Sequence, residues 1–88
     1  MAYSYSQERE KLFTDDGQRM FLRVRDHVNQ CLKQSGAVRM QEAMAGAGTG
    51  DSWTMLACVD RLVELKELIE IPQGDVAGQY RVFVRAYQ

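Results

Sequence analysis

The chain has 88 residues, of which 45% are apolar and 26% are charged. This composition is typical of one globular domain with a small core and excludes a disordered chain. Eleven Lys and Arg against twelve Asp and Glu leave a net charge of −1, so nucleic-acid binding would require a local basic patch. No apolar run is long enough to span a membrane, and the start, MAYSYSQEREK, has no apolar signal core. Cys31 and Cys58 lack paired spacing, so we expect reduced thiols in a soluble, cytoplasmic protein.

Residues 1–13 are predicted to form an N-terminal tail with a short helix, and residues 14–88 to form the domain. The first seven residues are mostly polar, which indicates a loose tail. Ser6 can cap a short helical turn that runs to Phe13. Leu12 and Phe13 are its apolar anchors.

A long helix is predicted from Asp15 to about Ser35. Asp15 is placed to accept the free amide of Gln18, and acidic residues suit the positive end of the helix dipole. Gly36 supplies a left-handed C-terminal stop. One stripe of residues repeats at intervals of three and four and is expected to face the core: Phe21, Val24, Val28, Cys31 and Leu32.

Two shorter elements and a second clear helix follow. Residues 37–40 favour a brief strand, and residues 41–45 a short helix with Met40 and Met44 turned inward. After the glycine-rich AGAGTG, Asp51 or Ser52 is a strong cap for a third helix that extends to about Glu67. Its expected inward line is Leu56, Val59 and Val63, flanked by Trp53, Met55 and Leu62, and its expected outward face holds Thr54, Ala57, Cys58, Arg61 and Glu64.

The end of the chain is predicted to be a β-hairpin. Residues 69–71 alternate apolar with acidic, PQGDVAG supplies turn chemistry, and residues 79–87 alternate again. The alternation places Tyr80, Val82 and Val84 on one face of the last strand. Arg81, Phe83 and Arg85 then share the other, polar face.

This order of elements resembles that of a winged helix-turn-helix domain. "DSWTMLACVDRLVELKELIEI" resembles the recognition helix of small bacterial and phage winged-helix transcriptional regulators, followed by a leucine-isoleucine step at Leu68 and Ile69. "AVRMQEAMA" is similar to the preceding strand and second helix, and "GDVAGQYRVFVRA" to the wing and its return strand. The resemblance implies an α+β fold with a three-helix core, a short strand and a C-terminal two-stranded wing. One departure is Glu67, where such regulators usually have glycine.

The resemblance implies sequence-specific binding to double-stranded DNA in transcriptional regulation, with the third helix in the major groove. Arg61 would reach a guanine edge, and Thr54 a phosphate or a thymine methyl group. Asp60 and Glu64 flank Arg61, and the wing tip, residues 73–79, carries Asp75 and no basic residue. The expected DNA-binding residues are Ser52, Thr54, Arg61, Arg81 and Arg85.

The alternative interpretation is a winged-helix protein–protein interaction module, an adaptor or inhibitor that does not bind DNA. Its expected interface residues are Trp53 and Phe83 with Arg81 and Arg85, because aromatic residues and arginine are enriched at interface cores. Phe83 and Trp53 can equally pack into so small a core. A homodimer that pairs through residues 4–13 is compatible with both interpretations.

Neither an enzyme nor a cofactor site is expected. "AGAGTGD" lacks the lysine or the dinucleotide spacing of phosphate-binding loops, so these glycines are interpreted as a turn. His27 and Cys31 lie one helical turn apart, but a structural zinc site needs two further ligands. A single histidine also gives no complete set of nucleophile, base and orienting group.

Overall fold

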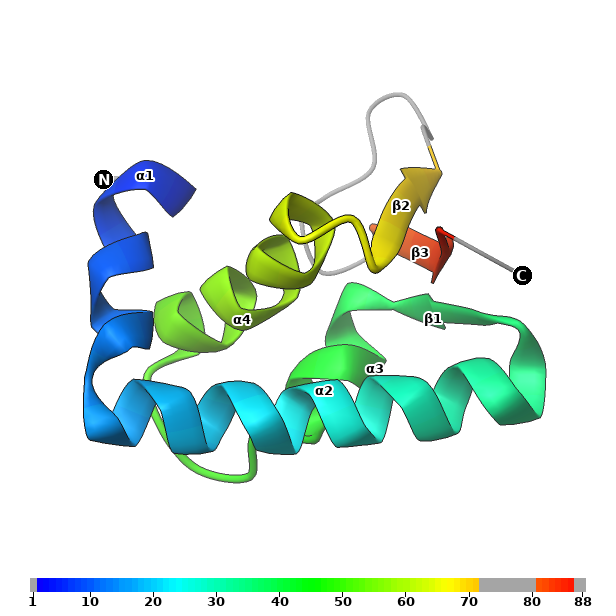
Figure 1. Ribbon diagram of the computed structural model, residues 1–88, viewed down its shortest axis with the longest axis horizontal. Helices are drawn as coiled ribbons and strands as arrows, with labels where there is room; N and C mark the ends of the chain where they lie inside the picture. Colours follow the sequence, from blue (N-terminus) through cyan, green and yellow to red (C-terminus); the bar gives the residue numbers. More distant parts are fainter. Residues whose placement is uncertain (1, 72–80, 87–88) are drawn as a thin grey trace.

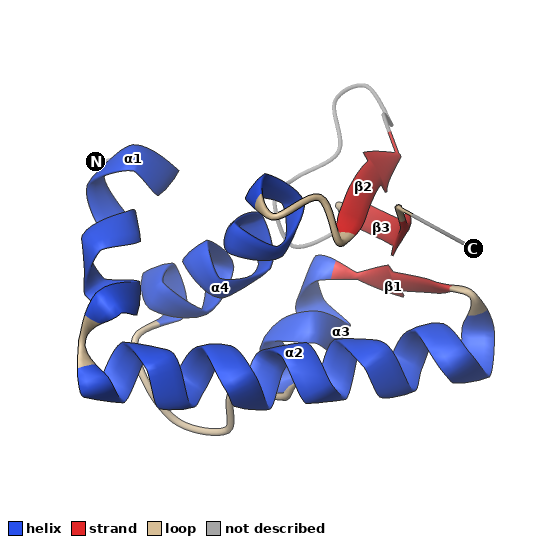
Figure 2. Ribbon diagram, in the orientation of Figure 1, coloured by secondary structure: helices blue, strands red, loops and turns tan. Residues whose placement is uncertain are grey.

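The computed structural model describes residues 2–71 and 81–86, which form four α-helices, a 3₁₀ helix and a three-stranded antiparallel sheet (Figures 1 and 2). The fold is therefore of the α+β class, as the sequence predicts. The helices are α1 (Tyr5–Glu8), α2 (Asp15–Ser35), α3 (Met40–Ala45) and α4 (Ser52–Glu64), with the 3₁₀ helix η1 (Arg9–Phe13) after α1. The strands are β1 (Ala37–Arg39), β2 (Leu68–Ile71) and β3 (Val82–Arg85).

The long helix α2 begins and ends at capping residues that are visible in the sequence. Thr14, one residue before the expected cap, accepts the amide of Gly17 at 3.0 Å through its hydroxyl. Gly36 adopts a left-handed φ of 77° and donates its amide to the Leu32 carbonyl at 2.9 Å. The helix buries the stripe Met20, Phe21, Val24, Val28 and Leu32, whereas Cys31 is half-buried.

The helix α4 starts at its predicted cap but ends earlier than expected. The Asp51 carboxylate accepts the Trp53 amide at 3.4 Å and the Thr54 hydroxyl at 3.0 Å. After Glu64 the chain leaves the helix in a Schellman motif, in which the Lys66 amide donates to Val63 at 2.9 Å and the Glu67 amide to Leu62 at 3.0 Å. Lys66 has the left-handed φ of 63° that this motif requires.

The sheet has the strand order β1-β3-β2, so β3 lies in the centre. On β3, Val84 lies between Ala37 and Ile69, and Val82 lies between Arg39 and Ile71. In Figure 1, α2 and α3 lie on one side of β1, and α1 lies at the end of the molecule away from the sheet. Residues 73–79, the predicted wing tip, lie outside the described residues, as do Tyr80 and Tyr87.

The core contains Phe83, which decides between the two placements that the sequence left open and excludes Phe83 as an exposed interface residue. Phe83 is fully buried opposite Val38, and both side chains face the helices. The alternation of a strand then turns Val82 and Val84 to the outside. The face expected to be polar and exposed is thus the inner face, because a phenylalanine contributes more buried apolar area than valine.

The expected orientation of α4 is also wrong in part. Thr54, Ala57 and Cys58, which were expected to face outward, are buried against the core. Leu56 and Val63, which were expected to line the core, are only partly buried at its margin. Small side chains on the inner face allow α4 to approach α2 closely, because the distance between packed helices follows the size of the contacting side chains. Val59 and Leu62 are buried as predicted, and they complete the inner face.

Candidate interaction surfaces

The N-terminal segment is bound to α4 by two carboxylates one helical turn apart. The Tyr3 hydroxyl donates to Asp60 Oδ2 at 2.6 Å, and the Tyr5 hydroxyl donates to Glu64 Oε1 at 2.7 Å. Arg9 Nε lies 3.0 Å from both carboxylate oxygens of Glu64. The first residues are therefore in contact with α4, although the sequence predicts a loose tail there.

The same two carboxylates hold two of the arginines that were expected to contact DNA. Arg61 donates to Glu64 Oε1 at 2.6 Å. Arg81 donates to Asp60 Oδ1 at 2.9 Å and to the Glu70 carboxylate at 2.7 and 2.9 Å. Both arginines are less than a quarter exposed, with side-chain accessibilities of 22% for Arg61 and 23% for Arg81. Their charges are largely offset by acids of the same chain.

The pKa shifts in this cluster follow from these contacts. Hydrogen bonds from Tyr5 and Arg61 lower the pKa of Glu64 to about 2. Burial, with the hydrogen bond to Glu64, raises the pKa of Tyr5 to about 12. The Arg81 hydrogen bond lowers the pKa of Glu70. Glu64 and Glu70 are therefore charged at neutral pH, and Tyr5 keeps its proton.

The remaining predicted site residues do not gather on one exposed surface. Ser52, at the start of α4, and Arg85, at the end of β3, are exposed. Thr54 is 8% exposed, and its hydroxyl is directed to Asp51 rather than to solvent. Trp53 is half-buried. The buried Phe83 is covered by the Arg81 guanidinium, 5.2 Å from the ring centroid, so Phe83 is not available as an interface anchor.

The side of the sheet that faces away from the helices, here called the outer face, is mainly apolar. Register and alternation place six side chains on it in two rows. Ile69 is 51% exposed and Ile71 is 38% exposed, although both are large aliphatic residues. Five of the six residues are apolar, and the charged one lies at a corner of the face: Ala37, Val84 and Ile69 in one row, Arg39, Val82 and Ile71 in the other.

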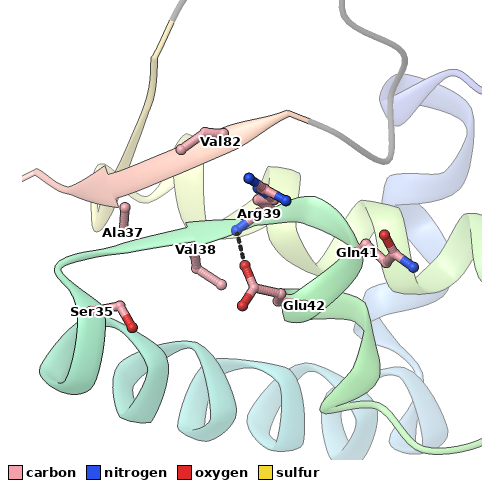
Figure 3. Close-up of a pocket in the computed structure, with 7 residues that line it drawn as sticks. All are labelled: Ser35, Ala37, Val38, Arg39, Gln41, Glu42 and Val82. Atoms are coloured by element: carbon pink, nitrogen blue, oxygen red, sulfur yellow. Dashed lines mark hydrogen bonds between the residues drawn. The ribbon is translucent and has the colours of Figure 1, made fainter.

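A cavity adjoins the outer face at each edge of the sheet. The cavity at the β1 edge has a volume of about 660 Å³ (Figure 3) and is lined by Ser35, Ala37, Val38, Arg39, Gln41, Glu42 and Val82. There the Arg39 amide donates to Glu42 Oε1 at 3.1 Å, so this edge amide has a partner. The cavity at the β2 edge, of about 350 Å³, is lined by Val63, Lys66, Leu68, Ile69, Glu70 and Ala86.

His27 and Cys31 lie together, as their spacing predicts. Cys31 Sγ is 3.6 Å from His27 Nε2, which is itself 2.9 Å from the Glu42 carbonyl oxygen. In the part of the chain that the structure describes, no three His, Cys, Asp or Glu side chains are grouped as a metal site would require. Over the same residues, no helix has the length and apolar character needed to cross a bilayer.

Sequence reasoning missed the contacts of Tyr3 and Tyr5 because they join residues 57 and 59 positions apart. It did separate the two faces of β3, but it left open whether Phe83 faces the core. The available signal for an apolar outer face was the spacing of two residues between Val82 and Val84 in one strand and between Ile69 and Ile71 in the other. No protein-family model, curated protein or solved structure matches the chain.

Proposed function

We propose that this chain is a winged-helix protein-interaction module that binds another protein through the outer face of its sheet. The order α2, β1, α3, α4, β2, β3 and the antiparallel strand order β1-β3-β2 support the winged-helix assignment. They are the elements that the resemblance to winged-helix regulators implies. In this assignment α4 takes the position of the recognition helix, and β2 and β3 take that of the wing.

The exposed apolar outer face is the observation that carries the proposal. Ile69 and Ile71 present large aliphatic side chains to solvent beside Val82 and Val84. Contiguous apolar patches on small proteins mark interaction sites more often than single exposed apolar residues do. In the described part of the chain, no element packs on this face, so a partner would complete it.

DNA binding, the first expectation from the sequence, has less support from the geometry. A protein that neutralises phosphates needs accessible lysine and arginine residues, because counterion release supplies most of the affinity. Arg61 and Arg81 are instead paired with Glu64, Asp60 and Glu70. Tyr3 and Tyr5 also contact Asp60 and Glu64 on α4, so the N-terminal segment lies against this part of the helix.

Site-specific photo-crosslinking in the cells that make the protein tests the proposal. A photoreactive amino acid is placed at Ile69 on the outer face, at Ser52 at the start of α4, or at Leu22 on α2. Leu22 is the matched control because it is 51% exposed, the same as Ile69. The expected result is a discrete protein adduct from position 69 that is absent from positions 52 and 22.

Two results would overturn the proposed function. One is a nuclease-sensitive adduct from position 52 with none from position 69, which would indicate that α4 binds DNA as a recognition helix. The other is the same protein adducts from positions 22 and 69, which would show that contact does not depend on the outer face.

A further inference from the structure

We propose that the outer face accepts a single amphipathic helix of the partner, with acidic residues beside its apolar stripe. This inference rests on the proposed function and adds the chemistry of the bound segment. It follows from the size of the face and from the charges at its margins.

The dimensions of the outer face suit one helix. Three strands at ~4.8 Å spacing place the two edge strands roughly 10 Å apart, about the diameter of an α-helix with its side chains. Four residues of β2 extend for roughly 13 Å, which corresponds to about nine residues of helix. A second copy of this chain would need about 800 Å² per partner for a stable dimer, and two rows of three side chains offer much less.

The margins of the outer face carry two cations, one at each edge, and one acid, Glu42, whose carboxylate accepts the Arg39 amide at the β1 edge. Arg39 is exposed at the corner formed by β1, and Lys66 is exposed beside Ile69 at the β2 edge. Within residues 2–71 and 81–86, neither side chain forms an ion pair. The nearby Glu70 is engaged by Arg81. Acidic residues on both flanks of a bound helix would therefore find cations on opposite edges of the sheet.

The cavities at the two edges of the sheet are consistent with this arrangement. The β1 cavity lies beside Arg39 and Val82, and the β2 cavity lies beside Lys66 and Ile69. Long apolar side chains at the borders of a helix stripe can enter these spaces, while the stripe itself packs on Val82 and Val84. Such anchoring of a helix by spaced apolar residues is a recurring mode of recognition.

Selection from a displayed library tests the inference on the complete chain. The library contains helix-forming peptides and extended peptides, each with acidic, neutral and basic flanks. Selection uses the wild-type protein, with counter-selection on Val84→Lys, so that retained peptides depend on the outer face. The expected result is enrichment of helical peptides with acidic flanks.

Charge reversal then identifies the contact. Arg39→Glu is expected to weaken binding of an enriched acidic peptide by about fivefold and to strengthen binding of its basic counterpart. Leu22→Lys, at an aliphatic position on α2 that is 51% exposed, like Ile69, is expected to leave both affinities unchanged. Circular dichroism of each variant checks that the fold is retained.

The possible failures of the two proposals are distinguishable. Enrichment of extended or basic peptides that still require Val84 would overturn the acidic helix and leave the outer face as a protein-binding site. If every peptide that the wild type selects also binds Val84→Lys, so that counter-selection retains none, both proposals would be overturned. An unchanged affinity of acidic peptides for Arg39→Glu would overturn the role of charge in this inference.

Discussion

Lys66 has a backbone conformation that most side chains avoid. Its φ of 63° lies in the left-handed region, and it ends α4 at the position where helices usually have glycine. The winged-helix resemblance implies a glycine just before the leucine-isoleucine step, at the position of Glu67. In the structure the residue with the left-handed φ is Lys66, one position earlier. The chain therefore contains a removable source of backbone strain.

Lys66→Gly is predicted to increase the free energy of unfolding by about 0.5–1 kcal/mol. Glycine relieves the strained φ, and its extra freedom in the unfolded chain offsets part of the gain. Urea denaturation measures the change, with Glu67→Gly as the control at the adjacent position. A stabilisation by Glu67→Gly and not by Lys66→Gly would contradict this assignment of the left-handed residue.

Glu64 is the residue through which acid is predicted to weaken the N-terminal contacts. Its pKa in the folded chain is about 2, below the ordinary value of 4.5, chiefly because Tyr5 and Arg61 donate to it. A lowered pKa stabilises the fold at pH values above 4.5, and this contribution is lost as the pH falls from about 4.5 to about 2.

Thermal unfolding between pH 2 and pH 7 tests this linkage. The wild type is predicted to lose more stability than Glu64→Gln as the pH falls through that window, since the amide does not titrate. Tyr5→Phe is predicted to reduce the pH dependence in the same direction, because it removes the main donor to Glu64. Identical pH profiles for the wild type and Glu64→Gln would contradict the proposed role of Glu64.

At the scale of single elements, the order and most boundaries of the helices could be predicted from local signals. Gly36 and Asp51 mark helix ends through capping chemistry that acts within a few residues. The rotational orientation of α4 could not be predicted in the same way. Apolar residues surround most of that helix, so periodicity alone does not select the face on which Ala57 and Cys58 are buried.

The last strand posed the same difficulty in another form. Val82 and Val84 on one face and Phe83 on the other are all apolar, so alternation separates the faces without showing which is inside. The pairing of Phe83 with Val38 settles it, and that contact joins distant parts of the sequence. The sequence alone therefore could not show whether Phe83 faces the core or the solvent, because the pairing with Val38 is not visible in it.

The orientation of β3 predicts a large difference between neighbouring substitutions. Phe83→Ala is predicted to lower the free energy of unfolding by about 3–5 kcal/mol, because it leaves a cavity among fully buried side chains. Val84→Ala, on the outer face, is predicted to cost less than about 1 kcal/mol. Equal losses for the two variants in urea denaturation would place both residues in similar surroundings and contradict the register described here.

At the scale of the whole molecule, the charged residues are unevenly distributed, although the net charge is only −1. Acidic residues of α4 and β2 pair with Arg9, Arg61 and Arg81, so three arginines act mainly within the chain. The outer face of the sheet has one charged residue in six, and within residues 2–71 and 81–86 no helix or strand covers it. This distribution is suited to protein recognition better than to a polyanion.

The arginines around α4 are paired with carboxylates of the same chain, and the proposal of protein binding in place of DNA binding depends on this pairing. It is tested most directly by titrating a labelled DNA duplex at low salt with the wild type and with the Asp60→Asn/Glu64→Gln variant. The two substitutions remove the carboxylate partners of Arg9 and Arg61 and one of the two partners of Arg81, which keeps Glu70. They change the net charge from −1 to +1, because each removes one negative charge. Negligible binding is expected for the wild type, and a salt-sensitive gain in binding is expected for the variant. Tight wild-type binding that weakens steeply with salt, is lost on Arg61→Ala and is unaffected by the double substitution would contradict the proposal.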